Sequence, residues 1–161
     1  MVIILIGVAG SGKTTVGRML ARRAGWEFYD ADDLHPPQNR EKMSRGIALT
    51  DDDRLPWLHA VRDLITRCLA EKRAAVIACS ALKQYYRDLL MENPSSVKLV
   101  YLKGSPALIE QRLARRAGHF FDQRLLQSQF DTLEEPANAI VVDIAAPPEK
   151  IAETIRSRLA L

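Results

Sequence analysis

Residues 7–14 combine glycines, a lysine and a threonine in the spacing G-x-x-x-x-G-K-[ST], which is typical of a phosphate-binding loop. Glycines let the backbone form a nest whose N–H groups converge on a phosphate, and a following helix adds partial positive charge. Lys13 can then contact the terminal phosphates, and the Thr14 hydroxyl can ligate Mg²⁺. The residues predicted to contact the nucleotide are Gly7, Val8, Ala9, Gly10, Ser11, Gly12, Lys13, Thr14 and Thr15. An apolar run before the loop and a helical pattern after it favour a nucleoside triphosphate site over an ordinary glycine-rich turn.

The carboxylates that could complete this chemistry follow a different strand. The apolar run 74–79 continues into Ser80 and lacks the aspartate expected of a Walker B strand, whereas Asp30 and Asp32 follow the run 27–29. Ligands of an open α/β sheet collect at the carboxyl ends of its strands. We therefore expect Asp30 to help Thr14 hold Mg²⁺ and Asp32 to face an acceptor hydroxyl. In an extended segment the two side chains would point the same way, and the alternative is a solvated acidic turn.

The composition is that of an ordinary globular protein, and the length fits one domain, residues 1–161. A hydrophobic fraction of 47% is enough for a core, and a net charge of +3 suits small anionic substrates better than nucleic acid. We expect no membrane partner, because no cleavage site or apolar span is present. Cys68 and Cys79 lack metal-ligand spacing, which suits a reducing cytoplasm.

Short apolar runs alternate with helical patterns, which predicts a largely parallel sheet covered by helices. Helices are expected at about 13–24, ending before Gly25, at 55–71, at 106–116 after a Ser105 cap, and after Pro148. The predicted strands are Val2–Ile6, Glu27–Tyr29, Ala74–Cys79, Val97–Leu102 and Ile140–Ile144.

Five further segments, read together, resemble gluconokinases over nearly the whole chain. They are DADDLHP at 30–36, NREKM at 39–43, LTDDDRLPWL at 49–58, CSALKQYYRD at 79–88 and GHFF at 118–121. The resemblance implies ATP- and Mg²⁺-dependent phosphorylation of D-gluconate to 6-phospho-D-gluconate. It also implies a three-layer P-loop kinase fold with strand order 2-3-1-4-5 and a helical lid, and a homodimer.

Arg54 is the residue that this resemblance assigns to the acceptor carboxylate. A more distant similarity to shikimate kinase supports that role, and it supports Asp30 near the metal and Asp32 near the acceptor hydroxyl. The planar guanidinium can hold a carboxylate at two points. The alternative is a local ion pair with Asp51 or Asp53, which come just before Arg54 in the sequence.

Three further residues are predicted to contact the substrate. Lys83 and Arg87 follow the third strand at helical spacing and would face the same cleft, although a solvated helix face is the competing interpretation. His35 lies beside the acidic turn and could hydrogen-bond a substrate hydroxyl; the resemblance is what lifts it above an ordinary surface histidine.

Residues 112–130 are predicted to form a lid. Arg112, Arg115, Arg116 and Arg124 flank the GHFF segment, and closure of such a segment would exclude water and bring a cation to the transferring phosphoryl group. Arg112 and Arg116 are the predicted catalytic arginines.

Two other functions remain open from the residues alone. A nucleotide-dependent switch is disfavoured by the acidic residues, by the predicted lid and by the lack of an [NT]-K-x-D motif for guanine. A kinase of the same fold with another acceptor, such as shikimate or a nucleotide, is the second. A shikimate kinase would carry a glycine-rich turn after the third strand, where this chain has residues 80–83, Ser-Ala-Leu-Lys.

Overall fold

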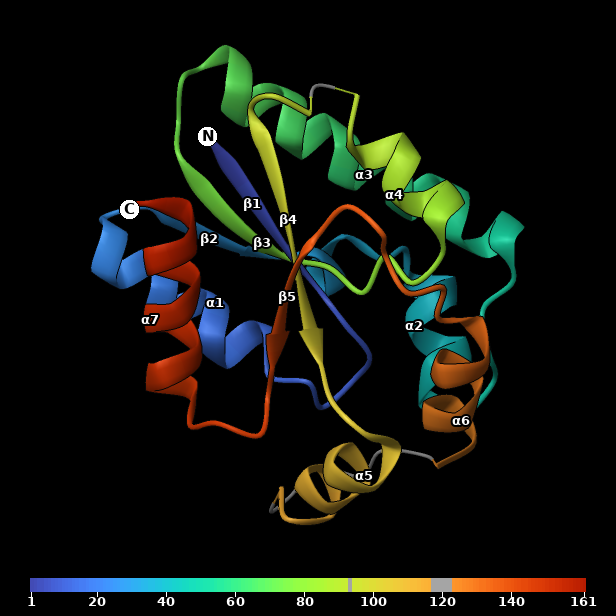
Figure 1. Cartoon of the computed structure of the whole chain (residues 1–161). Coiled ribbons are helices and arrows are strands. Elements are labelled where there is room, and N and C mark those ends of the chain that lie inside the picture. The colour runs from blue at the N-terminus through green and yellow to red at the C-terminus, as the bar shows by residue number, and fades with distance from the viewer. Residues whose placement is uncertain (93, 117–122) are drawn as a thin grey trace.

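The computed structural model describes residues 1–92, 94–116 and 123–161. Its centre is a five-stranded parallel sheet of order β2-β3-β1-β4-β5, which confirms the predicted order (Figure 1). The strands are β1 (Val2–Ile6), β2 (Glu27–Asp30), β3 (Ala75–Ala78), β4 (Val97–Lys103) and β5 (Ile140–Asp143). All five predicted strands are present; β1 has the predicted bounds, and no end of the other four differs by more than one residue.

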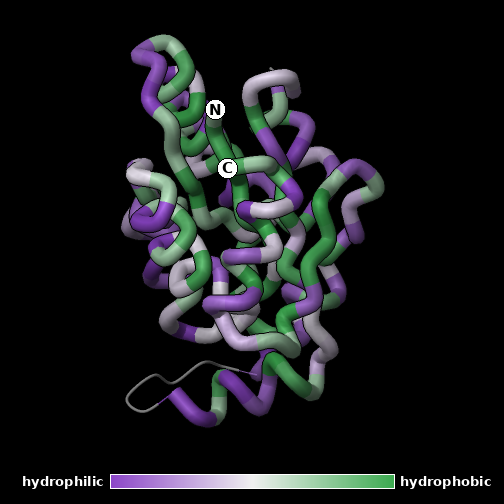
Figure 2. The backbone as a smooth tube through the Cα atoms, turned by 60° about the vertical axis from the view of Figure 1, so that its left-hand side comes forward, coloured by the Kyte–Doolittle hydropathy of each residue, from purple (hydrophilic) through white to green (hydrophobic). Residues whose placement is uncertain are grey.

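Helices cover both faces of the sheet, because the alternating side chains of each central strand point to opposite faces. In β1, Ile4 and Ile6 pack with α3 (Asp51–Ala70) and α4 (Gln84–Leu90), whereas Ile3 and Leu5 pack with α1 (Lys13–Ala24) and α7 (Pro148–Leu159). Figure 2 shows hydrophobic strands in the middle of the molecule, with hydrophilic and hydrophobic residues alternating along the helices around them. The result is three layers, with the sheet between two layers of helices (Figure 1).

Local signals set several helix ends. Gly25 ends α1 with a left-handed φ of 70°, and Ser105 caps α5 (Pro106–Ala114) as predicted. The third helix begins at Asp51 rather than Leu55, because Thr50 and Asp53 form a reciprocal capping box ahead of Pro56. Within the described residues, no helix is long and apolar enough to cross a membrane.

Two elements near the site were not predicted as helices, the short 3₁₀ helix η1 (Ala31–Leu34) and α2 (Pro37–Ser44). Helix α6 (Gln123–Thr132) falls largely within the helical lid that the resemblance implies. The expectation that residues 30–32 are locally extended is therefore wrong, because Asp30 caps η1 through the backbone N–H of Asp32. The GHFF segment of the predicted lid lies outside the described residues, between α5 and α6.

Candidate active site

The phosphate-binding loop joins the end of β1 to the start of α1. Gly12 adopts a left-handed φ of 92° at the helix N-terminus and leaves the first helical N–H groups without a side-chain cap. Lys13 extends back over the loop, where its Nζ donates to the carbonyls of Gly7 at 2.8 Å and Val8 at 2.9 Å. Burial lowers the pKa of Lys13, while Asp32 and Asp30 oppose this shift. A bound phosphate would give the ammonium group a stronger anionic partner.

Thr14 and Asp30 meet beside this loop. The Thr14 hydroxyl donates a hydrogen bond to Oδ2 of Asp30 at 2.8 Å. This contact brings together two oxygen atoms, one from α1 and one from β2, that could bind a metal ion. The second oxygen of Asp30, Oδ1, accepts from the backbone N–H of Asp32 at 3.1 Å. Hard oxygen ligands of this kind suit Mg²⁺, which usually keeps several waters and binds through one or two protein groups and substrate phosphates. Among the residues placed by the structure, no cluster of three or more His, Cys, Asp or Glu side chains forms a denser metal site.

A cavity of about 300 Å³ adjoins the loop and has the size of a small-molecule site. Asp32 opens onto this cavity near Lys13, although it lies in a 3₁₀ turn and not in an extended segment. Desolvation by the surrounding protein raises the pKa of the Asp32 carboxyl, and the nearby Lys13 ammonium opposes the shift. The polar side chains that line the cavity are Lys13, Asp32, His35, Ser44, Arg54, Ser80, Ser128 and Gln129.

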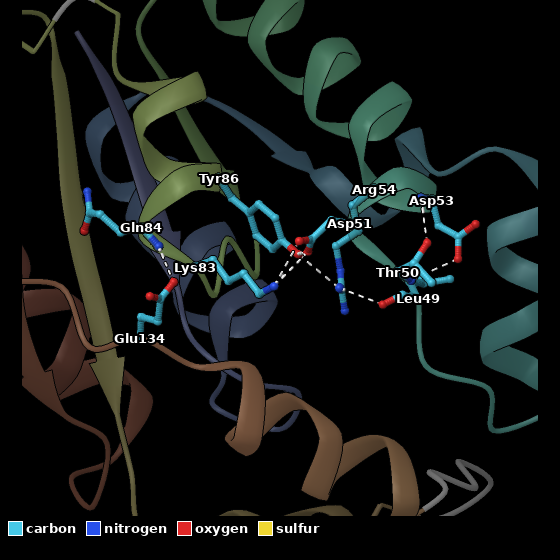
Figure 3. A network of polar contacts seen from close by, with 9 residues as sticks. All are labelled: Leu49, Thr50, Asp51, Asp53, Arg54, Lys83, Gln84, Tyr86 and Glu134. Carbon is cyan, nitrogen blue, oxygen red and sulfur yellow. Dashed lines mark hydrogen bonds and ion pairs between the residues drawn. The ribbon is translucent and has the colours of Figure 1, made fainter.

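Arg54 is held in this cavity by neutral partners. Its Nη1 donates to the Leu49 carbonyl at 2.7 Å and to the Tyr86 hydroxyl at 3.1 Å, and its guanidinium lies 5.6 Å from the centre of the Tyr86 ring. Figure 3 shows Arg54 between these groups. Within the described part of the chain, its Nε and Nη2 groups make no hydrogen bond, so one edge of the guanidinium is available to a carboxylate.

The aspartates before Arg54 are engaged by other residues, which argues against the local pairing alternative. Asp51 accepts from Lys83 at 2.9 Å and from the Tyr86 hydroxyl, as Figure 3 shows. Asp53 accepts from Lys42 at 2.9 Å and from the Thr50 N–H. Both contacts lower the pKa of Asp53, to about 2.

His35 also lines this cavity. Its ring stacks on Trp57, with centroids 4.2 Å apart, and only 7% of its surface is exposed. Burial and the charges of Arg54 and Arg40 lower the pKa of His35 to about 4, so the ring is neutral near pH 7.

The sequence and the fold of this chain are similar to those of known kinases. A family model described as shikimate kinase matches residues 9–160. A thermoresistant gluconokinase of Escherichia coli strain K12 is 45% identical over 152 residues, covering 92% of this chain and 87% of that protein. A probable gluconokinase of Rattus norvegicus is 46% identical over 154 residues, covering 84% and 83% of the two chains. The crystal structure of a gluconokinase from Sinorhizobium meliloti is 44% identical with a TM-score of 0.89, covering 98% and 90%.

The chain belongs to the gluconokinase family. The match to the shikimate kinase model is consistent with this membership, since the structure has the sheet order expected for a P-loop kinase. Nucleotide phosphoryl transfer is therefore the general chemistry of this site.

The predicted role of Arg87 in substrate binding is contradicted. In this gluconokinase-family chain Arg87 is 1% exposed, and its guanidinium donates to the carbonyls of Ala81, Leu82 and Glu134. Its remaining N–H groups donate to the Gln84 side chain. All five donors are thus used inside the protein, and Arg87 fastens the loop after β3 to the segment after α6.

Lys83 also lies outside the cavity. It is paired with Asp51 at 2.9 Å and faces an open groove that is otherwise lined by α6 and Glu134. Lys83 is therefore connected to the cavity only indirectly. It pairs with Asp51, Asp51 accepts from the Tyr86 hydroxyl, and that hydroxyl accepts from Arg54.

The two arginines predicted to be catalytic differ in position. Arg112 donates through Nη2 to the carbonyl of Ile144, after β5. Arg116 lies close enough to Lys13 for its charge to lower the pKa of that lysine. Arg116 is thus the one with an electrostatic connection to the phosphate-binding loop.

Sequence reasoning did not identify several residues of this gluconokinase-family site. Gln129 of α6 accepts from the Ala9 N–H at 2.6 Å and so connects the C-terminal end of the predicted lid to the phosphate-binding loop. Tyr86 holds Arg54 across 32 positions of sequence, and Trp57 supports His35. Trp57 is buried in α3, and the helical periodicity of a sequence indicates burial but not which ring lies beside it.

Proposed function

We propose that this protein transfers the γ-phosphoryl group of ATP to the terminal hydroxyl of D-gluconate, giving 6-phospho-D-gluconate and ADP. The observation that carries the proposal is the cavity itself, because Lys13 of the phosphate-binding loop and Arg54 line the same small space. A phosphate donor at one wall and a carboxylate anchor at another fit an acid with a distant hydroxyl. The gluconokinases with 44–46% identity support the same substrate.

The division of roles follows from charge and position. The backbone of residues 7–15 and Lys13 would bind the ATP phosphates, and the lysine charge would stabilise the γ-phosphoryl group as it leaves. Arg54 would bind the gluconate carboxylate through its free edge. Asp32 would orient the acceptor hydroxyl and accept its proton, since the loose transition state of phosphoryl transfer requires alignment more than early deprotonation.

Mg²⁺ fits the Thr14–Asp30 pair. These residues would hold it directly or through water, and when bound it supplies neutralisation of charge on the β- and γ-phosphate oxygens. The raised pKa of Asp32 does not prevent its role as a base, because nearby Lys13 favours the carboxylate.

The remaining features of the proposal concern the lid and the assembly. One domain, residues 1–161, would carry both substrate sites, and residues 112–130 would close over them, with Arg116 or Arg112 contacting the phosphates. We also propose a cytoplasmic homodimer. The buried, unpaired Cys68 and Cys79 support a reducing compartment, and the dimer can be checked by light scattering.

The decisive experiment is an assay of ADP formation with purified protein, Mg²⁺-ATP and one acceptor at a time. Gluconate should give turnover, whereas shikimate, glycerate and nucleoside monophosphates should give little above the background without acceptor. Lys13→Ala should lower turnover by about 10²–10³-fold, the scale for one preorganised charge at the reacting group. ADP formation that is independent of gluconate, or that prefers another acceptor, would contradict the proposal.

A further inference from the structure

The cavity wall contains a buried pair, His35 and Asn39, whose hydrogen-bond pattern has a chemical consequence for substrate recognition. Asn39 lies in α2 and is only 2% exposed. Its Nδ2 lies 2.8 Å from the backbone carbonyl of Asp53 and 3.3 Å from Nδ1 of His35. One amide nitrogen therefore contacts both α3 and the histidine ring.

The Asp53 carbonyl fixes the orientation of the Asn39 amide. A carbonyl oxygen can only accept a hydrogen bond, so the Asn39 group that faces it at 2.8 Å must be the NH₂ group and not the amide oxygen. The same NH₂ group has a second hydrogen, which faces His35. The ring nitrogen opposite this hydrogen must then be the acceptor, so Nδ1 carries no proton.

The charge state of His35 completes the assignment. Burial disfavours a second proton on the ring, and the charges of Arg54 from α3 and Arg40 from α2 act in the same direction. A neutral imidazole without a proton on Nδ1 carries it on Nε2. No group in the described ranges of the chain hydrogen-bonds Nε2, and the ring lines the acceptor cavity.

We propose that Asn39 is a positioning residue that holds His35 as the Nε2–H tautomer, so that His35 donates a hydrogen bond to an oxygen of the bound polyhydroxy acid. This inference rests on the proposed function for the identity of the ligand. In this role Nε2–H of His35 donates, so the residue favours a ligand oxygen that can accept a hydrogen bond. Trp57 holds the plane of the ring, and Asn39 selects which nitrogen carries the hydrogen.

The tautomer can be measured without any activity. In protein labelled with ¹⁵N-histidine, long-range ¹H–¹⁵N spectra at pH 7.5 should give His35 an unprotonated Nδ1 and a protonated Nε2. The His35→Gln variant identifies the signals of this residue among those of the other histidines. An Nδ1–H or doubly protonated His35 would overturn the inference, and this result would leave the gluconate assay untouched.

Asn39→Asp tests the cause. A carboxylate opposite Nδ1 accepts instead of donating, so the His35 signals should change to an Nδ1–H or a charged ring, and the KM for gluconate should rise. Unchanged His35 signals in a folded Asn39→Asp protein would refute the role of Asn39. If that variant does not fold, Asn39→Ser provides the test, because loss of the fixed amide should produce a mixture of tautomers.

Substitutions of His35 separate donation from shape. His35→Gln keeps an N–H donor and should retain most of the affinity for gluconate. His35→Leu should raise the KM for gluconate roughly threefold to tenfold, the scale of one neutral hydrogen bond, with the KM for ATP unchanged. His59→Gln, on the exposed side of α3, is the matched control and should behave as wild type. Equal KM values for the Leu and Gln variants would contradict donation by His35.

Discussion

Replacement of Arg54 by alanine should selectively weaken the binding of gluconate. The structure leaves the Nε and Nη2 edge of Arg54 free, while Leu49 and Tyr86 hold Nη1 in place. A carboxylate on that edge would form charge-assisted hydrogen bonds, whose loss costs about 1.5–3 kcal/mol. Since each 1.4 kcal/mol corresponds to tenfold in affinity, the KM for gluconate should rise roughly tenfold to a hundredfold.

Lys83→Ala is the matched control for this experiment. It removes a cation from the same polar network, but from a partly exposed ion pair with Asp51 that lies outside the cavity. Pairs of this kind contribute about 0–1 kcal/mol, so the KM for gluconate should change by less than about fivefold. Arg54→Lys should fall closer to the alanine variant than to wild type, because a single ammonium group cannot reproduce the planar two-point contact.

The assay couples ADP formation to NADH oxidation, with gluconate varied at saturating ATP and then ATP varied at saturating gluconate. Thermal unfolding of each variant checks that the fold is retained. If Arg54→Ala raises the KM for ATP instead, the residue belongs to the nucleotide site. If Lys83→Ala has the larger effect on gluconate, the carboxylate lies in the groove beside α4 and the assignment of the cavity is wrong.

Four other substitutions give separate tests. Asp32→Asn should lower kcat by about 10²–10⁴-fold through loss of the base, with ATP affinity by calorimetry near wild type; full kcat would make Asp32 a simple turn residue. Asp30→Asn should raise the Mg²⁺ concentration for half-maximal activity by about tenfold or more, and an unchanged Mg²⁺ titration would contradict its metal role. Arg87→Leu should lower the free energy of unfolding by about 2–4 kcal/mol, measured with urea, because it leaves buried carbonyls without donors; a stability equal to wild type would refute this. For His35, the folded pKa of about 4 lies below the ordinary 6.5, so the unfolded chain takes up the proton first and stability falls as pH drops from 6.5 to 4. His35→Gln should lose less stability than wild type over that interval in urea titrations, and equal losses would show that His35 is not held neutral.

Much of the fold was predictable because its signals are local. Most of the strands are short apolar runs, such as β1, and Gly25 marks the end of α1. The order of the strands came from the resemblance to a known family and not from the pattern itself. Helix α2 gave no periodic signal, since residues 37–44 are almost all polar, and it is held by contacts of Asn39 and Lys42 with α3. Such a helix depends on tertiary partners that a local pattern does not contain.

The site was predictable to the extent that its residues are neighbours in the sequence. The phosphate-binding loop is a contiguous motif, and its lysine lies where the spacing predicts. Lys83 and Arg87 share a helical spacing, but spacing alone does not say whether a face meets solvent, a cavity or the protein interior. The packing of α4 against the loop after β3 decides this, and it buries Arg87 while leaving Lys83 at the surface.

The hydrogen bonds of Asp30 explain why Asp30 and Asp32 still form a pair, although residues 30–32 do not make the extended segment that the sequence predicts. One oxygen of Asp30 accepts from the Thr14 hydroxyl, and the other accepts from the backbone N–H of Asp32. The same carboxylate therefore orients the proposed metal ligands and starts the 3₁₀ turn that carries the proposed base. In an extended strand the two side chains would share a face by periodicity alone, whereas here a hydrogen bond fixes their relation. Asparagine at position 30 keeps an oxygen acceptor for the turn and removes the charge, so Asp30→Asn separates metal binding from the position of Asp32.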